Sequence, residues 1–201
     1  MDEPRDVCLT VARSELILGG QKSGKSRRAE ALAAAWLAQE RDHRAVLIAT
    51  AQAHDAEMRA RIERHQRDRA QRVPGLATLE APHDVPAAIQ QAGGADTLRI
   101  VDCLTLWLTQ QLMPLEGFEE IKPPARDSYA LYAPFLEAIE TCPGPIVLVG
   151  NEIGLGVIPL GGEVRAFVDA LGGLNQAVAA RCERVTFMAA GLPLTLKDAA
   201  R

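Results

Sequence analysis

A glycine-rich stretch at residues 19–26 has the composition and spacing of a loop that binds phosphate. Every fixed position of the pattern G-x-x-x-x-G-K-[ST] is matched by Gly19-Gly20-Gln21-Lys22-Ser23-Gly24-Lys25-Ser26. Glycines let the backbone curl so that several N–H groups point at one phosphate, and the start of a following helix adds partial positive charge. We predict that Lys25 reaches the β- and γ-phosphates and that the Ser26 hydroxyl ligates Mg²⁺. The alternative is a glycine-rich turn that binds nothing.

A phosphate loop of this kind works with an acidic residue that ends an apolar strand, and Asp102 is the best-placed candidate. It follows the run Leu98-Arg99-Ile100-Val101. By itself, an aspartate in this position is more often a helix cap or a turn residue. Beside a phosphate loop, the Mg²⁺ role is favoured.

The segment from residue 55 to residue 72 is basic and contains His65 among six arginines. Helical spacing places Arg61, His65 and Arg69 on roughly one face. Arginines there could hold a polyphosphate and favour a neutral, nucleophilic imidazole, so that His65 does chemistry on the phosphate. The simpler interpretation is a solvated helix whose charges pair with one another. Spacing alone leaves both interpretations open.

The elements around these residues alternate between strand and helix. Apolar runs predict strands at residues 16–18, 45–49, 77–79, 98–101, 146–149 and 185–188, and an antiparallel edge strand at 194–197. Helices are expected at residues 26–39, 55–72, 85–91, 104–113, 128–141 (despite Pro134) and 163–181. This order predicts an α/β fold of the P-loop NTPase, RecA-like type, with three layers: a mainly parallel sheet and helices on both faces.

Length and composition limit the classes of protein that fit. The chain has 201 residues, of which 48% are apolar and 24% charged, as in a globular protein. We expect an N-terminal extension at residues 1–14, loose or partly ordered, and a single P-loop domain at residues 15–201. A net charge of −4 argues against a dedicated nucleic-acid binder. No apolar run is long enough to span a membrane. The four cysteines are widely spaced, which favours reduced thiols in a cytoplasmic protein.

Several segments together resemble one family. They are residues 16–26, 48–51, 55–65, 78–82, 101–108 and 151–159, continued by residues 165–176. The patterns E-M-x-x-R-I-x-x-H at residues 57–65 and N-E-x-G-x-G-x-I-P at residues 151–159 are far more specific than the phosphate loop. From about Glu15 to Lys197 the chain resembles the bifunctional adenosylcobinamide kinase / adenosylcobinamide-phosphate guanylyltransferase family of cobalamin biosynthesis.

The resemblance implies two reactions at one nucleotide site. ATP or GTP would phosphorylate the hydroxyl of adenosylcobinamide, and GTP would then transfer GMP to the new phosphate through a covalent guanylyl-histidine. The histidine at the family's position is His65. The nucleotide contacts implied by the family are the phosphate loop and Ala49, Thr50, Ala51, Gln66, Arg67, Asp68, Arg69, Glu80 and Asp102. The resemblance also implies a homotrimer.

Three other functions are alternatives for the same residues. A P-loop small-molecule kinase with a single activity would use His65 only as a phosphate contact. A regulatory GTPase would read guanine with Asn-Lys-x-Asp, whereas residues 151–154 are Asn-Glu-Ile-Gly. A RecA-like motor acting on nucleic acid conflicts with the acidic balance and the small size. The bifunctional transferase is therefore the preferred prediction.

Overall fold

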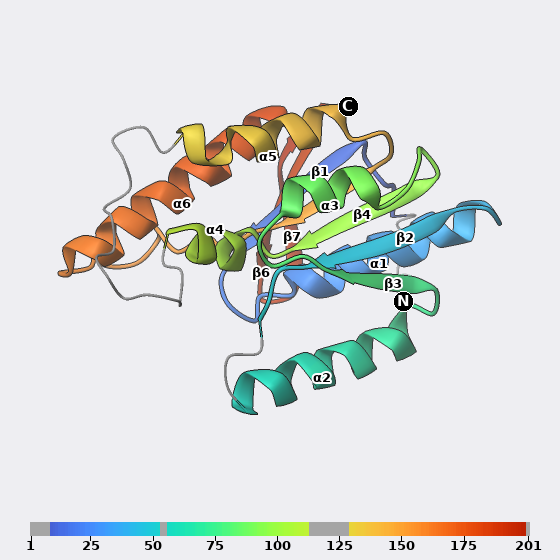
Figure 1. Cartoon of the computed structure of the whole chain (residues 1–201), viewed down its shortest axis with the longest axis horizontal. Helices are drawn as coiled ribbons and strands as arrows, with labels where there is room; N and C mark the ends of the chain where they lie inside the picture. Colours follow the sequence, from blue (N-terminus) through green and yellow to red (C-terminus); the bar gives the residue numbers. More distant parts are fainter. Residues whose placement is uncertain (1–8, 53–55, 113–128, 200–201) are drawn as a thin grey trace, which may run out of the picture.

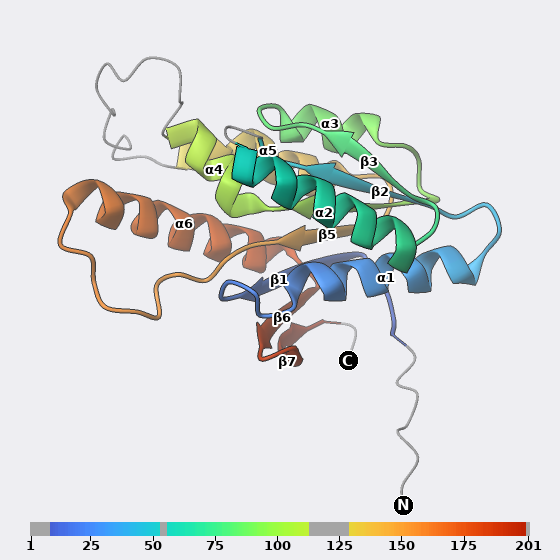
Figure 2. The ribbon, with the colours of Figure 1, turned by 90° about the horizontal axis from the view of Figure 1, so that it is seen from below.

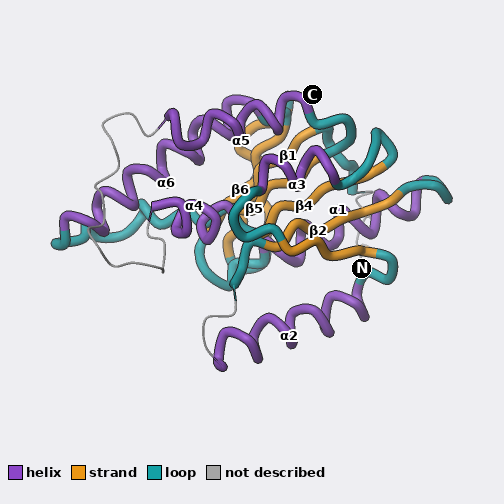
Figure 3. The backbone as a smooth tube through the Cα atoms, viewed as in Figure 1, coloured by secondary structure: helices purple, strands orange, loops and turns teal. Residues whose placement is uncertain are grey.

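The computed structural model describes residues 9–52, 56–112 and 129–199, and a seven-stranded sheet forms its centre (Figures 1 and 3). The strands are β1 (Ser14–Gly19), β2 (Arg44–Ala49), β3 (Leu76–Glu80), β4 (Thr97–Asp102), β5 (Ile146–Val149), β6 (Arg184–Ala189) and β7 (Leu192–Asp198). Their order is β3-β2-β4-β5-β1-β6-β7. The pairs among β1 to β6 are parallel, and β7 runs antiparallel to β6. The predicted parallel sheet with an antiparallel edge strand is confirmed.

Helices cover both faces of this sheet. They are α1 (Lys25–Gln39), α2 (Ala56–Arg72), α3 (Val85–Gln91), α4 (Leu104–Leu112), α5 (Tyr129–Thr141) and α6 (Gly162–Arg181). Figure 2 shows α1 on one side of the sheet and α3, α4 and α5 on the other, with α2 along the β3 edge. The predicted helices are confirmed within the described residues; Asp55, Met113 and Ser128, which the sequence added to three of them, lie outside.

The strand side chains alternate between two apolar cores, as expected for a sheet buried on both faces. In β1, Leu16 and Leu18 pack into the core beneath α3, α4, α5 and α6, whereas Ile17 packs into the core beneath α1. Among the described helices, none is both long enough and apolar enough to cross a membrane.

The end of the expected N-terminal extension belongs to the fold. Ser14 is the first residue of β1 and is buried, so the strand begins one residue inside the segment assigned to the extension. Leu9 and Val11 pack against the core beneath α1. The Arg13 side chain donates hydrogen bonds to the carbonyl groups of Cys142 and Gly144. Residues 9–13 are therefore packed, and residues 1–8 lie outside the described part.

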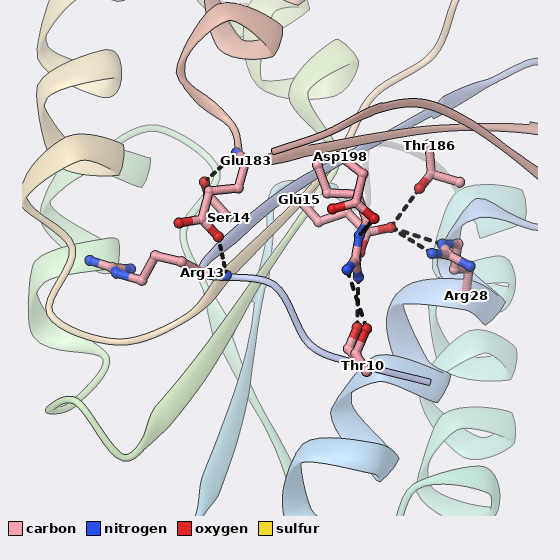
Figure 4. Close-up of polar contacts among 9 residues, drawn as sticks. Thr10, Arg13, Ser14, Glu15, Arg28, Glu183, Thr186 and Asp198 are labelled. Atoms are coloured by element: carbon pink, nitrogen blue, oxygen red, sulfur yellow. Dashed lines mark hydrogen bonds and ion pairs between the residues drawn. The ribbon is translucent and has the colours of Figure 1, made fainter. Parts of the chain in front are cut away.

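A buried carboxylate in β1 links this strand to α1 and β6 (Figure 4). Glu15 is fully buried in β1, where it accepts hydrogen bonds from Arg28 at 2.9 Å and from Thr186 at 2.8 Å. Arg184 lies 3.5 Å from the same carboxylate, 3.4 Å from Asp198 and 2.7 Å from the Thr10 carbonyl oxygen. A buried carboxylate needs such partners because its desolvation is costly. No local sequence pattern predicted this cluster.

Arg99 is buried in β4, where its guanidinium binds main-chain carbonyl groups. Its guanidinium donates to the carbonyl oxygens of Ile89 at 2.8 Å, Thr97 at 2.8 Å and Gly94 at 3.2 Å, and also to that of Gly93. Carbonyl dipoles of α3, of the turn that follows it and of the first residue of β4 therefore replace water around the charge.

Replacing Arg99 with methionine should lower the free energy of unfolding by about 3–5 kcal/mol, because several buried carbonyl groups would lose their donor. Thermal and urea unfolding measure the change. Arg44, exposed at the start of the neighbouring strand β2, provides the control, and Arg44→Ala should change the stability by less than about 0.5 kcal/mol. Equal stability of the two variants would contradict this account.

Candidate functional site

The phosphate loop connects β1 to α1 and has a shape that requires glycine at two positions. Gly19 has φ +149°, and a Cβ there would run into the carbonyl oxygen of Met188. Gly24 has φ +104°, in the left-handed region. The Gly191 N–H, from the turn between β6 and β7, donates to the Ser23 carbonyl oxygen at 3.0 Å. The loop is thus held against the sheet by backbone contacts.

Lys25 is the first residue of α1 and folds back over the loop. Its Nζ donates to the Gly20 carbonyl oxygen at 2.6 Å, and the side chain is buried. Burial lowers the pKa of Lys25, and the nearby Asp102 carboxylate acts in the opposite direction. No side chain caps the start of α1, so the first N–H groups of the helix remain suited to binding an anion.

Asp102 ends β4 and reaches the phosphate loop across the sheet. Although β5 lies between β4 and β1, the Ser26 Oγ donates to Asp102 Oδ2 at 2.7 Å. Burial raises the pKa of Asp102, and this effect is opposed by the Ser26 hydrogen bond and by the positive charges of Arg69 and Lys25. The structure therefore places a carboxylate and a hydroxyl together at the first turn of α1.

The ends of β2 and β3 extend this edge of the sheet. Ala49 is aligned with Asp102 on one side and with Glu80 on the other, and Glu80 is exposed. Thr50 is fully buried, and its hydroxyl donates to the Cys103 carbonyl oxygen at 2.9 Å and accepts from the Cys103 N–H at 2.8 Å. The Thr50 side chain thus links two strand ends and does not face solvent, whereas Ala51 is partly exposed.

Helix α2 is joined to the body near its C-terminal end. Arg72 forms two hydrogen bonds with the buried Glu30 of α1, at 2.7 and 3.1 Å. Arg69 lies 3.4 Å from Thr78 Oγ1 of β3. Burial lowers the pKa of Arg69, and the carboxylates of Glu30 and Asp102 oppose that shift. Arg69 of α2 is therefore close enough to Asp102, the carboxylate beside the phosphate loop, for that carboxylate to raise its pKa.

His65 lies on the exposed surface of α2, as do Gln66, Arg67 and Asp68. It precedes Arg69 by one turn, about 6 Å along the helix axis. The site residues from the sequence therefore fall into two groups. The first comprises the phosphate loop, Ala49, Glu80 and Asp102 at the carboxyl edge of the sheet. The second group lies on α2 and comprises His65, Gln66, Arg67 and Asp68. Arg69 lies between the two groups.

The segment after β5 adds contacts that were not assigned to the site from the sequence. The Glu152 N–H donates to the Gly19 carbonyl oxygen at 3.1 Å. The Asn151 N–H donates to Thr105 Oγ1 at 3.0 Å, and its carbonyl oxygen accepts from Asn175 Nδ2 at 3.1 Å. The specific pattern at residues 151–159 was the sequence signal that could have assigned this segment to the site. In the structure the pattern begins beside Gly19, the first glycine of the phosphate loop.

This sheet order, with a phosphate loop after β1 and a carboxylate at the end of β4, defines a P-loop NTPase fold. Residues 15–196 match the family described as cobinamide kinase / cobinamide phosphate guanyltransferase. The chain belongs to that family.

Two relatives illustrate the similarity. The bifunctional adenosylcobalamin biosynthesis protein CobP of Pseudomonas aeruginosa is 46% identical over 188 residues, which cover 91% of this chain and 96% of the relative. The bifunctional adenosylcobalamin biosynthesis protein CobU of Escherichia coli is 32% identical over 190 residues, which cover 90% and 98%. The predicted family is confirmed, and each relative is matched over nearly its whole length.

Proposed function

We propose that this enzyme phosphorylates adenosylcobinamide with ATP or GTP and then transfers GMP from GTP to adenosylcobinamide phosphate, giving adenosylcobinamide-GDP. The observation that supports it best is the 2.7 Å hydrogen bond from Ser26 Oγ to Asp102 Oδ2 beside the phosphate loop. The chain also matches the family over residues 15–196. Both reactions need a nucleoside triphosphate, and one phosphate loop can hold it for both.

In the kinase step, the chain's own groups position the triphosphate. The N–H groups of the loop and of the first turn of α1 would bind the β-phosphate, and Lys25 would exchange its contact with Gly20 for phosphate oxygens. Ser26 and Asp102 offer the hydroxyl and carboxylate oxygens that Mg²⁺ prefers, with phosphate and water completing its ligands. Bound there, Mg²⁺ would neutralise charge on the phosphate oxygens.

In the guanylyl step, a ring nitrogen of His65 attacks the α-phosphorus of GTP and pyrophosphate leaves. An oxygen of the corrinoid phosphate then attacks the same phosphorus, the P–N bond breaks and His65 is regenerated. The attachment of α2 near its C-terminal end would allow His65 to approach the loop. Cys103 is a poor alternative nucleophile, because burial and the neighbouring Asp102 raise the pKa of its thiol to about 11.

Isotopic labelling tests the proposal directly. Protein incubated with GTP labelled on the α-phosphate should retain the label after denaturation, and added adenosylcobinamide phosphate should remove it. Label on the γ-phosphate should pass to adenosylcobinamide instead. Transfer of the γ-label without any retained α-label would leave the single-activity kinase as the function. The trimer implied by the family and the cytoplasmic location inferred from the cysteine spacing stay predictions.

Asp102→Asn should lower turnover at least about a hundredfold without lowering the stability of the free protein. Because burial raises the pKa of Asp102, the ionised carboxylate costs stability at neutral pH, and asparagine removes that cost while still accepting from Ser26. The unliganded variant should therefore melt no lower than the wild type at neutral pH. The difference should shrink as the pH falls and should vanish below about pH 3, where the carboxyl is mostly protonated in both the folded and the unfolded chain.

Thermal unfolding with and without MgGTP tests whether Asp102 contributes to binding the metal and nucleotide. The ligand should raise the melting temperature of the wild type and have much less effect on Asp102→Asn. A variant that melts far below the wild type, but whose folded fraction turns over normally, would make Asp102 a structural residue.

A further inference from the structure

An uncharged apolar segment follows β5 and leads into α6. Residues 153–162 contain no charged side chain. Four large apolar side chains in it are highly exposed: Leu155 at 77%, Val157 at 96%, Ile158 at 76% and Leu160 at 98%. Val164, in the first turn of α6, is also exposed. An apolar patch of this kind on a folded chain marks a surface that binds a partner.

The segment is anchored at both ends, so its position is defined. It starts where the Glu152 N–H meets the Gly19 carbonyl oxygen at 3.1 Å. At its far end, Arg165 Nη1 donates to the carbonyl oxygens of Pro159 at 2.9 Å and Leu160 at 2.5 Å. Figures 1 and 2 show the segment and the first part of α6 projecting beyond the carboxyl ends of the strands, on the side where the phosphate loop lies.

We propose that this apolar surface, residues 153–162 together with Val164, is where the corrinoid acceptor docks; the inference rests on the proposed function. A corrin ring carries methyl groups on its faces and neutral amide side chains around its rim. Such a ring fits a surface that is apolar and uncharged, as residues 153–162 are. At Gly156 a Cβ would meet nothing within 4 Å, so no other part of the described structure covers the segment at that point.

The position of the surface also favours the acceptor over a second copy of the chain. The hydroxyl that receives phosphate is carried on an arm outside the ring. The ring must therefore rest to the side of the phosphate loop while the arm enters it. The proposed surface starts beside Gly19 of the phosphate loop and extends away from the sheet, which meets that requirement. A protein partner on the same surface would cover the entrance that substrates use.

The test compares two pairs of exposed apolar residues. Val157→Asn with Leu160→Gln changes the proposed surface, and Leu194→Gln with Leu196→Gln changes β7, where the exposures are 59% and 57%. Equilibrium dialysis with adenosylcobinamide, followed by its visible absorbance, measures corrinoid binding. Dialysis with GTP measures nucleotide binding. The first pair should weaken corrinoid binding at least about tenfold and leave GTP binding unchanged, because two buried apolar contacts are lost. The β7 pair should change neither.

Each other result overturns the proposal in a recognisable way. Unchanged corrinoid binding by the first pair, or equal weakening by the β7 pair, removes the docking surface. A lower mass of the first pair in sedimentation, with corrinoid binding retained, assigns the surface to a second copy of the chain. A wild type that binds GTP but neither binds nor phosphorylates adenosylcobinamide refutes the proposed function itself.

Discussion

Lys25→Ala should reduce both the kinase and the guanylyl reactions by about a thousandfold, the usual cost of removing a preorganised charge from phosphoryl or acyl transfer. Lys25 is buried against Gly20 and lies at the start of α1, where the β- and γ-phosphates are expected. Its replacement removes the positive charge that lies near Asp102 and that is expected to bind the phosphates. Initial rates with α- and γ-labelled GTP measure the two reactions separately.

The control for Lys25 is Arg27→Ala, which removes a positive charge from an exposed position on the same turn of α1. Its rates should stay within about threefold of the wild type, since exposed charges contribute little. Circular dichroism shows whether either variant is folded. Near-normal phosphorylation by folded Lys25→Ala would refute the assignment of the loop.

His65→Asn should abolish the covalent guanylyl adduct and the transfer of GMP, while leaving much of the phosphorylation of adenosylcobinamide. Phosphorylation transfers the γ-phosphoryl group directly to the substrate hydroxyl and needs no protein nucleophile. Because His65 is exposed, its replacement should change stability by less than about 0.5 kcal/mol. Mass spectrometry of GTP-treated protein should find one GMP unit on His65, bound through a phosphoramidate that is labile in acid and stable in alkali.

Two other described histidines provide controls for the adduct. His83 lies just beyond β3, 2.8 Å from Gln52, and His43 stacks on Trp36 with ring centroids 3.7 Å apart. His83→Asn and His43→Asn should both keep the adduct. Arg64 cannot replace His65, because a guanidinium stays protonated and is not a nucleophile. An adduct that maps to any other residue, or persists in His65→Asn, would refute the nucleophile.

Local sequence patterns predicted most of this fold because the determinants are themselves local. Runs such as Ile146-Val147-Leu148-Val149 belong to strands buried on both faces, and Pro74-Gly75 lies one residue beyond the end of α2. That Ser26 and Asp102 lie close together was expected from the general arrangement of P-loop folds. The antiparallel turn into β7 was visible in Gly191-Leu192-Pro193.

The charged groups inside the fold could not be placed from the sequence, because their partners lie far along the chain. Thr186 and Arg184 are 171 and 169 residues from Glu15, and spacing gives no information at that separation. A charge inside an apolar run was the available signal at Glu15 and at Arg99. It predicts that a buried partner exists, without identifying it. The exposure of His65 was equally unpredictable, since it depends on how α2 leans against β3.

The position of β1 in the sheet has a consequence for folding during synthesis. The described neighbours of β1 are β5 and β6, which are made late, whereas β2, β3 and β4 can pair with one another as soon as they emerge. Long-range parallel pairing is slow, and domains fold as their pieces become available. A nascent chain that ends before Ile146 therefore carries the complete phosphate-binding motif without the strand pairs that fix it. Nucleotide-binding ability should arise only near the end of translation, with the arrival of β5 and β6.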